Sequence, residues 1–152
     1  MKSYTIYTDG SCLKNPGGPG GYACIILDND NDNIIYKKAF GEYITTNNRM
    51  ELKAAILGLS YFKSKTEITI VTDSTYVRNG FEKGWIQNWL KNNWKNSGNK
   101  PVKNRDLWEE LLKLVKMHDV RFKWVKGHSE NNYNNIADAM ARDAAIDAGL
   151  NK

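Results

Sequence analysis

The sequence predicts an α/β fold in one domain that spans residues 1–152. Three observations indicate this class. The 152-residue chain is 41% hydrophobic and 26% charged, which is ordinary for a single globular domain. Segments of alternating β-formers occur before and after segments with helical periodicity. Because strands that are separated by helices pair in parallel through right-handed crossovers, we expect a mixed sheet.

The first third of the chain predicts a meander of three antiparallel strands. These strands are expected at residues 4–8, 22–27 and 34–43. Asp9, Gly10 and Ser11 are expected to end the first strand, and the glycine- and proline-rich segment 15–21 is predicted to be a loop.

The remainder predicts five helices and two further strands. The helices are expected at about 49–63, 74–81, 85–94, 106–117 and 136–148, and the strands at 68–71 and 120–125. Asn48, with Glu51 three residues later, resembles an N-capping signature for the first helix. The first, fourth and fifth strands should therefore be parallel, and the second and third should extend the sheet antiparallel.

Positive charge is concentrated in one segment. The net charge is +5, and between residues 78 and 105 seven basic residues face one acid, a local charge of +6. The seven are Arg78, Lys83, Lys91, Lys95, Lys100, Lys103 and Arg105. Trp85, Trp89 and Trp94 alternate with these lysines, and aromatic rings beside cations suit a nucleic-acid strand. The alternative is that the tryptophans belong to the core, and we expect at least one to be structural.

Two acids stand at equivalent strand ends. Asp9 follows the first predicted strand and Asp73 follows the fourth. If these strands are neighbours, both carboxylates lie at the edge where α/β sheets form their sites, and their mutual repulsion favours a divalent cation. Oxygen ligands suit Mg²⁺ or Mn²⁺ rather than zinc. The alternative is that each acid caps the loop that follows it.

Two further acids stand near helix starts. Glu51 is expected in the first turn of the first long helix, and Asp138 near the start of the last helix. Both could bind metal, or both could simply favour the positive end of a helix dipole. Spacing alone leaves these alternatives open.

Other motifs are excluded. Segment 28–33 begins like a calcium loop, but Asn33 and Ala39 stand where that motif needs glycine and glutamate. Cys12 and Cys24 are expected to be reduced thiols in a cytoplasmic protein. No apolar run reaches the roughly 18 residues of a membrane span, and the N-terminus shows no signal peptide.

Five short motifs follow one another in an order that is specific as a set. They are Tyr7-Thr8-Asp9-Gly10-Ser11, Thr46-Asn47-Asn48-Arg49-Met50-Glu51, Thr72-Asp73-Ser74, Trp124-Val125-Lys126-Gly127-His128 and Ala137-Asp138, and the segment from Lys100 to Trp108 adds a sixth. Between about residues 4 and 146 the chain thereby resembles the type I ribonuclease H family of bacteria. The resemblance implies a five-stranded mixed sheet of order 3-2-1-4-5, with a basic protrusion at about residues 80–100.

The resemblance also implies an activity, namely endonucleolytic hydrolysis of the RNA strand of RNA–DNA hybrids by two metal ions, leaving 5′-phosphate and 3′-hydroxyl ends. The ions are expected to be Mg²⁺, with Mn²⁺ as a substitute, and the enzyme a monomer. The implied metal ligands are Asp9, Glu51, Asp73 and Asp138. His128 is expected to transfer a proton or to assist product release. Tyr133 and Asn135 depart from a relative that has acids there, which would make the site less negative.

The resemblance assigns separate residues to the two strands of the hybrid. Cys12, Asn15, Asn47, Asn48 and Asn134 are expected to contact the RNA strand. Thr46, Asn104, Trp85, Lys91 and Lys95 are expected to hold the DNA strand. Amide side chains both donate and accept hydrogen bonds, which suits a 2′-hydroxyl, although capping of the helix could occupy Asn47 or Asn48. Thr75 replaces a glutamine of relatives and would lose one contact.

Two rivals remain. A proofreading exonuclease has Asp-x-Glu in its first strand, where this chain has Asp9-Gly10-Ser11, and an integrase ends its triad with glutamate, where this chain has Asp138. A catalytically silent hybrid-binding module would lack one of the four acids, and all four are present.

Overall fold

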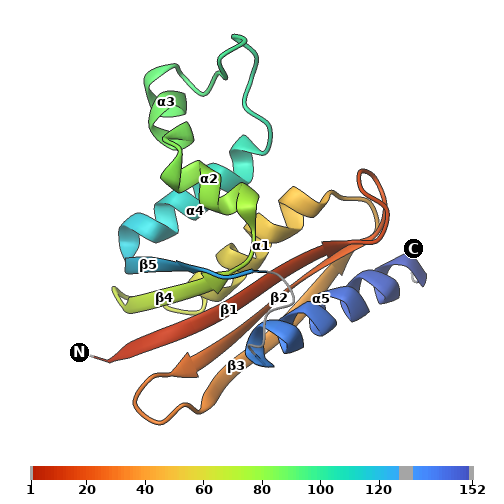
Figure 1. The fold of residues 1–152 in the computed structure, drawn as a ribbon, viewed down its shortest axis with the longest axis vertical. Helices are drawn as coiled ribbons and strands as arrows, with labels where there is room; N and C mark the ends of the chain where they lie inside the picture. The colour runs from red at the N-terminus through yellow and green to blue at the C-terminus, as the bar shows by residue number, and fades with distance from the viewer. Residues whose placement is uncertain (1, 127–131, 151–152) are drawn as a thin grey trace.

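The computed structural model describes residues 2–126 and 132–150 and contains one five-stranded sheet (Figure 1). The strands are β1 (Ser3–Cys12), β2 (Gly20–Asp28), β3 (Ile34–Glu42), β4 (Glu67–Thr72) and β5 (Asp119–Trp124). Their order is β3-β2-β1-β4-β5. β1 pairs with β4 and β4 pairs with β5 in parallel, whereas β2 pairs antiparallel with both β1 and β3. The predicted fold class and strand order are confirmed.

The first strand is longer than predicted. Asp9, Gly10 and Ser11 do not end it, because they pair with the start of β2, Asp9 opposite Ala23 and Ser11 opposite Gly21. Gly21 belongs to a strand rather than to the predicted loop. A β-carbon on Gly21 would lie 2.1 Å from the Ala141 carbonyl oxygen, so glycine here permits close packing of a helix. The glycine-rich segment therefore serves the sheet, which its composition does not reveal.

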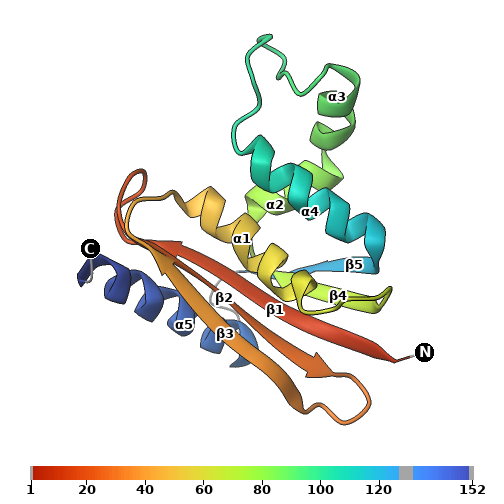
Figure 2. The same ribbon diagram turned by 180° about the vertical axis from the view of Figure 1, so that it is seen from behind.

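Helices cover the two faces of the sheet unequally (Figures 1 and 2). They are α1 (Asn47–Ser60), α2 (Thr75–Glu82), α3 (Trp85–Lys91), α4 (Arg105–Met117) and α5 (Asn132–Leu150). α5 packs on β1, β2 and β3 on one face, while α1 packs on β1 and β2 on the other and carries α4 on its side. The main core lies on the α1 side and includes Ile6, Leu52, Ile70 and Trp108. No described helix is long and apolar enough to cross a bilayer.

Between β4 and α4 the chain extends away from the sheet, and residues 80–100, expected to form the protrusion, lie in this part (Figure 1). Contacts between tryptophan rings support it: the Trp89 ring stacks on the Trp94 ring at 6.0 Å and meets the Trp108 ring edge-to-face at 5.4 Å. Trp94 has a left-handed backbone (φ 60°) and is only 9% exposed, so packing and its hydrogen bond from N–H to the Trp89 carbonyl hold it there. The expectation that at least one tryptophan is structural is confirmed. α3 ends at Lys91, three residues earlier than predicted.

Candidate active site

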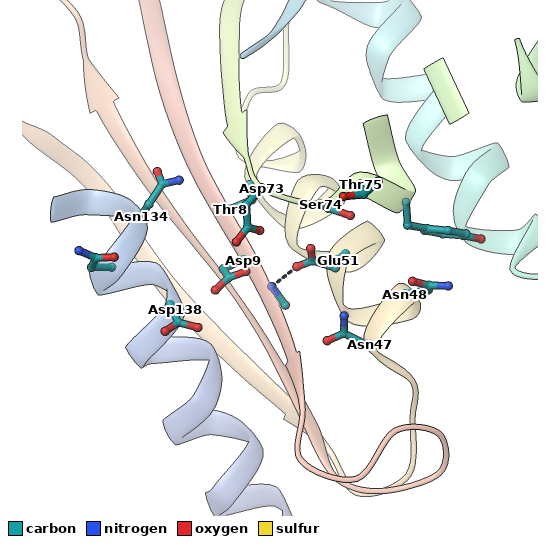
Figure 3. Close-up of a pocket in the computed structure, with 13 residues that line it drawn as sticks. Thr8, Asp9, Asn47, Asn48, Glu51, Asp73, Ser74, Thr75, Asn134 and Asp138 are labelled. Carbon is teal, nitrogen blue, oxygen red and sulfur yellow. Dashed lines mark hydrogen bonds between the residues drawn. The ribbon is translucent and has the colours of Figure 1, made fainter. Parts of the chain in front are cut away.

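A cavity of about 390 Å³ opens at the carboxyl ends of β1 and β4, between the start of α1 and the start of α5 (Figure 3). Four acids and four amides line it. They are Asp9, Glu51, Asp73 and Asp138, and Asn47, Asn48, Asn134 and Asn135. No lysine, arginine or histidine is among the described residues that line it. The cavity is thus strongly acidic, and hydrogen-bonding amides border it.

The sheet places Asp9 and Asp73 side by side. The parallel pairing of β1 with β4 ends at Tyr7 and Val71, and each aspartate lies two residues beyond that last pair. Asp73 follows the end of β4, as expected, whereas Asp9 still pairs with Ala23 of β2. The prediction that Asp9 lies past the end of its strand was wrong, because the antiparallel ladder continues where the parallel ladder stops. Equivalent positions in the parallel register nevertheless bring both carboxylates to one edge.

Glu51 reaches the same edge from α1. The helix starts at Asn47, so Glu51 lies in the second turn and not in the first. The Glu51 residue is only 7% exposed. Its Oε1 accepts a hydrogen bond from the Gly10 N–H (Figure 3). A β-carbon on Gly10 would lie 2.4 Å from the Glu51 nitrogen, so only glycine lets the helix come this close to β1. A favourable interaction with the helix dipole therefore does not explain Glu51.

Three of the carboxylates form a compact group. One oxygen from each of Asp9, Glu51 and Asp73 lies within 4.8 Å of the others. Burial raises the pKa of Asp9 well above its usual range, and the charges of Glu51 and Asp73 raise it further. Burial and the Asp73 charge likewise raise the pKa of Glu51, although the Gly10 N–H partly offsets this. Buried oxygen donors that repel one another fit a hard divalent cation, which would relieve the repulsion.

Asp138 faces this group from α5 (Figure 3). Its Oδ2 accepts a hydrogen bond of 3.1 Å from Arg142 Nη2, one turn further along the helix. It also contributes to the raised pKa of Asp9, which places the two side chains in electrostatic contact. Because the described part of α5 begins at Asn132, Asp138 lies almost two turns inside the helix rather than near its start. It is outside the group of three defined by the 4.8 Å limit.

The side chains of Asn47 and Asn48, beside the carboxylates, do not cap α1. The N-cap of α1 is Thr46, whose hydroxyl accepts a hydrogen bond of 3.2 Å from Arg49 N–H. The predicted capping role of Asn48 was wrong, because the helix begins one residue before it. Asn47 and Asn48 both line the cavity, and the Asn47 N–H donates to Asn15 Oδ1 over 3.0 Å. Asn15 therefore ties the loop after β1 to the start of α1.

Asn134 lines the acidic cavity, whereas Cys12 lies at the end of β1 and is not among the residues that line it. The Cys12 thiol donates to the Lys14 carbonyl at 3.3 Å, and lies 3.7 Å from the carbonyls of Gly18 and Thr45, so it orders the loop after β1. Cys12 and Cys24 are both free thiols, as expected. Asn134 projects from the first turn of α5 into the cavity (Figure 3).

The residues predicted for the DNA strand lie apart from the carboxylates. Asn104 has a left-handed backbone, its Oδ1 accepts from Arg49 Nη1 at 3.2 Å, and its Nδ2 donates to the Tyr76 hydroxyl at 3.1 Å. Trp85 and Lys95 line one cavity of about 330 Å³ on the protrusion. Lys91 is exposed at the end of α3. The structure thus separates an acidic region from a basic, aromatic one.

Arg49 and Tyr76 were missed by the sequence reasoning. Arg49 also makes a two-pronged ion pair with Asp106, at 3.1 and 2.9 Å, and Tyr76 accepts from Trp108 Nε1 at 2.9 Å. Together they join α1, α2 and α4 around Asn104. Arg49 lies inside one of the recognised motifs, which was the available signal. The predicted role of His128 falls outside the described residues.

Known proteins match nearly the whole chain. The family model "RNase H" matches residues 1–146. A ribonuclease H of Caldicellulosiruptor saccharolyticus is 50% identical over 142 residues, covering 93% of this chain and 95% of the relative. One of Pseudoalteromonas atlantica is 50% identical over 150 residues, covering 99% of this chain and 95% of the relative.

Solved structures agree in fold. LC9-RNase H1, described as a type 1 RNase H with the type 2 active-site motif, superimposes with a TM-score of 0.84 at 28% identity, over 97% of this chain and 74% of that chain. A foamy viral protease-reverse transcriptase in complex with RNA/DNA hybrid superimposes with a TM-score of 0.74 at 20% identity, over 96% of this chain and 20% of that chain. The sequence identity, the sheet order and the acidic cluster agree, and the chain belongs to the ribonuclease H family, enzymes that cut the RNA strand of RNA–DNA hybrids.

Proposed function

We propose that this ribonuclease H cuts its substrate with two Mg²⁺ ions held by Asp9, Glu51, Asp73 and Asp138. The observation that carries the proposal is the group of three carboxylates within 4.8 Å, two of them almost fully buried. Buried anions this close are unfavourable unless a cation compensates them. The oxygen-only donor set favours Mg²⁺, with Mn²⁺ as a substitute, over zinc.

The bound ions would activate the attacking water and stabilise the leaving 3′ oxygen, which gives 5′-phosphate and 3′-hydroxyl products. The protein's own contribution is to hold the ligands in place. Gly10 N–H fixes the Glu51 carboxylate, and Arg142 fixes Asp138 on the opposite wall. We assign His128 to proton transfer or product release. Tyr133 and Asn135 stand where a relative has acids. Neither side chain is a carboxylate, so the proposed ligands remain these four acids.

We propose that the RNA strand is recognised by amides at the rim of the acidic cavity. Asn47, Asn48 and Asn134 line that cavity, and the Thr46 cap leaves the first two side chains free of capping duty. Each amide can donate to and accept from a 2′-hydroxyl, the group that distinguishes RNA from DNA. Asn15 and Cys12 order the adjoining loop, and we assign backbone and side-chain contacts with RNA to this loop.

We propose that the DNA strand lies across Thr46, Asn104 and the protrusion. The Thr46 hydroxyl accepts from Arg49 N–H and still has its own proton to donate to a phosphate. Trp85 offers a ring to a sugar, and Lys91 and Lys95 offer charges to phosphates. Contacts of this kind ignore base identity, so we expect little sequence preference and strong dependence on salt.

We further propose that residues 1–152 act as one domain, as a monomer, in the cytoplasm. The acidic site and its amides come from β1, α1, β4 and α5 of the same chain, which supports a site that needs no second copy. Gel filtration with light scattering at concentrations above and below those of the activity assay tests this. A dimer that persists on dilution would contradict it.

One assay tests the proposed function. Labelled RNA–DNA hybrid, double-stranded RNA and double-stranded DNA are each incubated with the protein, with Mg²⁺ or with a chelator. We expect cleavage of the hybrid's RNA strand alone, and only with Mg²⁺. Cleavage of DNA, or hybrid cleavage that persists in chelator, contradicts the proposal. Binding of hybrid without any cleavage would indicate the rival function, a silent binding module.

A further inference from the structure

A second cavity adjoins the acidic one. It has a volume of about 250 Å³ and shares Asp73, Ser74 and Thr75 with the acidic cavity, so the two are contiguous. Its other walls are Arg78, Trp124, Val125 and Lys126. The second cavity therefore lies on the side of Asp73 that faces β5 and α2, away from Asp138.

The fold brings two cations to this second cavity. The Val125 N–H donates to the Thr72 carbonyl at 3.0 Å, which continues the β4–β5 pairing past the end of both strands and sets Lys126 beside Asp73. Arg78 lies in the first turns of α2 and its Nε donates to Glu82 Oε2 at 2.8 Å. This ion pair engages the guanidinium through Nε, and Arg78 is one of the residues that line the second cavity.

The two cavities differ in the charges of the residues that line them. Four acids and no cation are among the described residues that line the first, whereas two cations and one acid line the second. Metal ions compensate only the phosphate that lies against the carboxylates. The next phosphate along the same strand approaches an acidic edge, and it is stabilised where cations stand within reach.

We propose that Arg78 and Lys126 bind an RNA-strand phosphate adjacent to the one that is cut. The proposal rests on the proposed function, because it assumes that the scissile phosphate lies at Asp9, Glu51 and Asp73. Arg78 supplies a planar fork that matches phosphate oxygens, and Lys126 supplies a second point charge. The Ser74 and Thr75 side chains border both cavities, so the strand passes over them from one to the other.

The first test measures hybrid affinity against salt concentration in chelator for Arg78→Gln, Lys126→Gln and a matched control, Lys65→Gln. Lys65 is exposed and precedes β4 at the end opposite Asp73. Each cavity variant should lower the slope of log affinity against log salt by about 0.7–0.9, the value for one lost phosphate contact, and the control should leave it unchanged. Mg²⁺ affinity, measured by calorimetry without nucleic acid, should change by less than about twofold.

The second test locates the phosphate. A hybrid whose cleavable strand has a few central ribonucleotides between deoxyribonucleotides receives one methylphosphonate at a time on either side of the cut. One position should weaken wild-type binding about fivefold and should have no added effect in Arg78→Gln, as a shared contact requires.

Losses that add at every position, or slopes equal to that of the control, overturn the inference. A large change in Mg²⁺ affinity would instead show that the two cations only balance Asp73, and it overturns the inference as well. Cleavage of the unmodified hybrid by the wild type tests the proposed function separately, so the two failures remain distinct.

Discussion

The acidic cavity and the protrusion contain opposite kinds of side chain on opposite kinds of backbone. Asp9 and Glu51 are 8% and 7% exposed and stand on a central strand and inside a long helix. Lys91 and Lys95 are exposed and stand on a seven-residue helix and the loop after it. Left-handed residues such as Asn93 and Asn99 shape that loop. One region is built into the core, and the other is attached to it by contacts that include the edge-to-face packing of Trp89 on Trp108.

Under the proposed function, the acidic cavity would carry out the chemical step and the protrusion would bind the substrate. A cutting site must hold its ligands at fixed separations, so it benefits from burial and from regular backbone. A binding surface for a charged duplex needs charge and reach, and its contacts tolerate small displacements. We therefore expect changes in the acidic cavity to affect kcat and changes in the protrusion to affect KM.

The largest expected effect comes from Asp9→Asn. Loss of one ligand charge should lower kcat by about 10³-fold or more, while hybrid affinity changes by less than about twofold. Single-turnover cleavage and filter binding measure the two quantities. Asp119→Asn, at the exposed start of β5, is the control and should retain wild-type kcat. If Asp9→Asn remained within tenfold of the wild type, Asp9 would not be a metal ligand.

The double variant Lys91→Ala/Lys95→Ala tests the other region. It should raise KM about fivefold to tenfold and change kcat by less than about twofold, because two phosphate contacts are lost far from the reacting atoms. Lys37→Ala/Lys38→Ala removes the same charge from exposed positions of β3 and serves as the control. An unchanged KM, or a loss confined to kcat, would remove the distinction between the two regions.

Stability without metal should report the stored repulsion in the acidic cavity. Folding raises the pKa values of Asp9 and Glu51. At pH values above the ordinary carboxyl pKa, the folded protein therefore binds more protons than the unfolded chain does. Stability in chelator should therefore fall as pH rises from about 5 to 8, and Asp9→Asn should reduce this fall and raise Tm by about 2–8 °C at pH 8. Mg²⁺ should raise the wild-type Tm and so reduce the difference in Tm between Asp9→Asn and the wild type. Thermal scans of the wild type and of Asp9→Asn at several pH values check this prediction. A Tm difference between the two proteins that stays constant with pH would contradict it.

The smallest effect is expected where the two regions meet. Asp106→Asn weakens the ion pair with Arg49, whose side chain is 30% exposed, and such pairs contribute about 0–1 kcal/mol. Because Arg49 also holds Asn104, KM should rise about twofold while kcat stays constant. Asp30→Asn, on the distant β2–β3 turn, is the control. A fall in kcat would show that this contact controls the carboxylates as well.

The sequence predicted the order of the strands through the family resemblance, and it singled out the four acids that the structure brings to one cavity. It failed where one element depends on another. The length of β1 is set by pairing with Gly20 and Gly21. Gly21 is explained by the approach of α5, and Gly20 by the close approach of Thr45 and Met50. The N-cap of α1 is Thr46 rather than Asn48. The residue at which the helix begins depends on the path of the loop from β3, and the capping preferences of single residues do not specify that path.

The protrusion was predictable only in outline. Its charge and tryptophans are visible in the sequence, but the left-handed backbone of Trp94 is imposed by stacking on Trp89. The cavity at Arg78 and Lys126 joins residues 48 positions apart, and a parallel pairing that continues past β4 and β5 brings them together. No local pattern marks such a pair.

Gly10 sets how closely α1 approaches β1 beside the acidic cavity. The missing side chain lets α1 lie directly against β1, so the backbone segments that carry Asp9 and Glu51 are close together, and the Gly10 N–H also holds the Glu51 carboxylate. Ions differ in the gap they require: oxygen ligands stand at about 2.0–2.1 Å from Mg²⁺ and about 2.3–2.6 Å from Ca²⁺. If the site binds Mg²⁺ as proposed, this close approach of backbone favours the smaller ion and resists expansion of the site around the larger one. Selection between two chemically similar cations can thus originate from an absent methyl group.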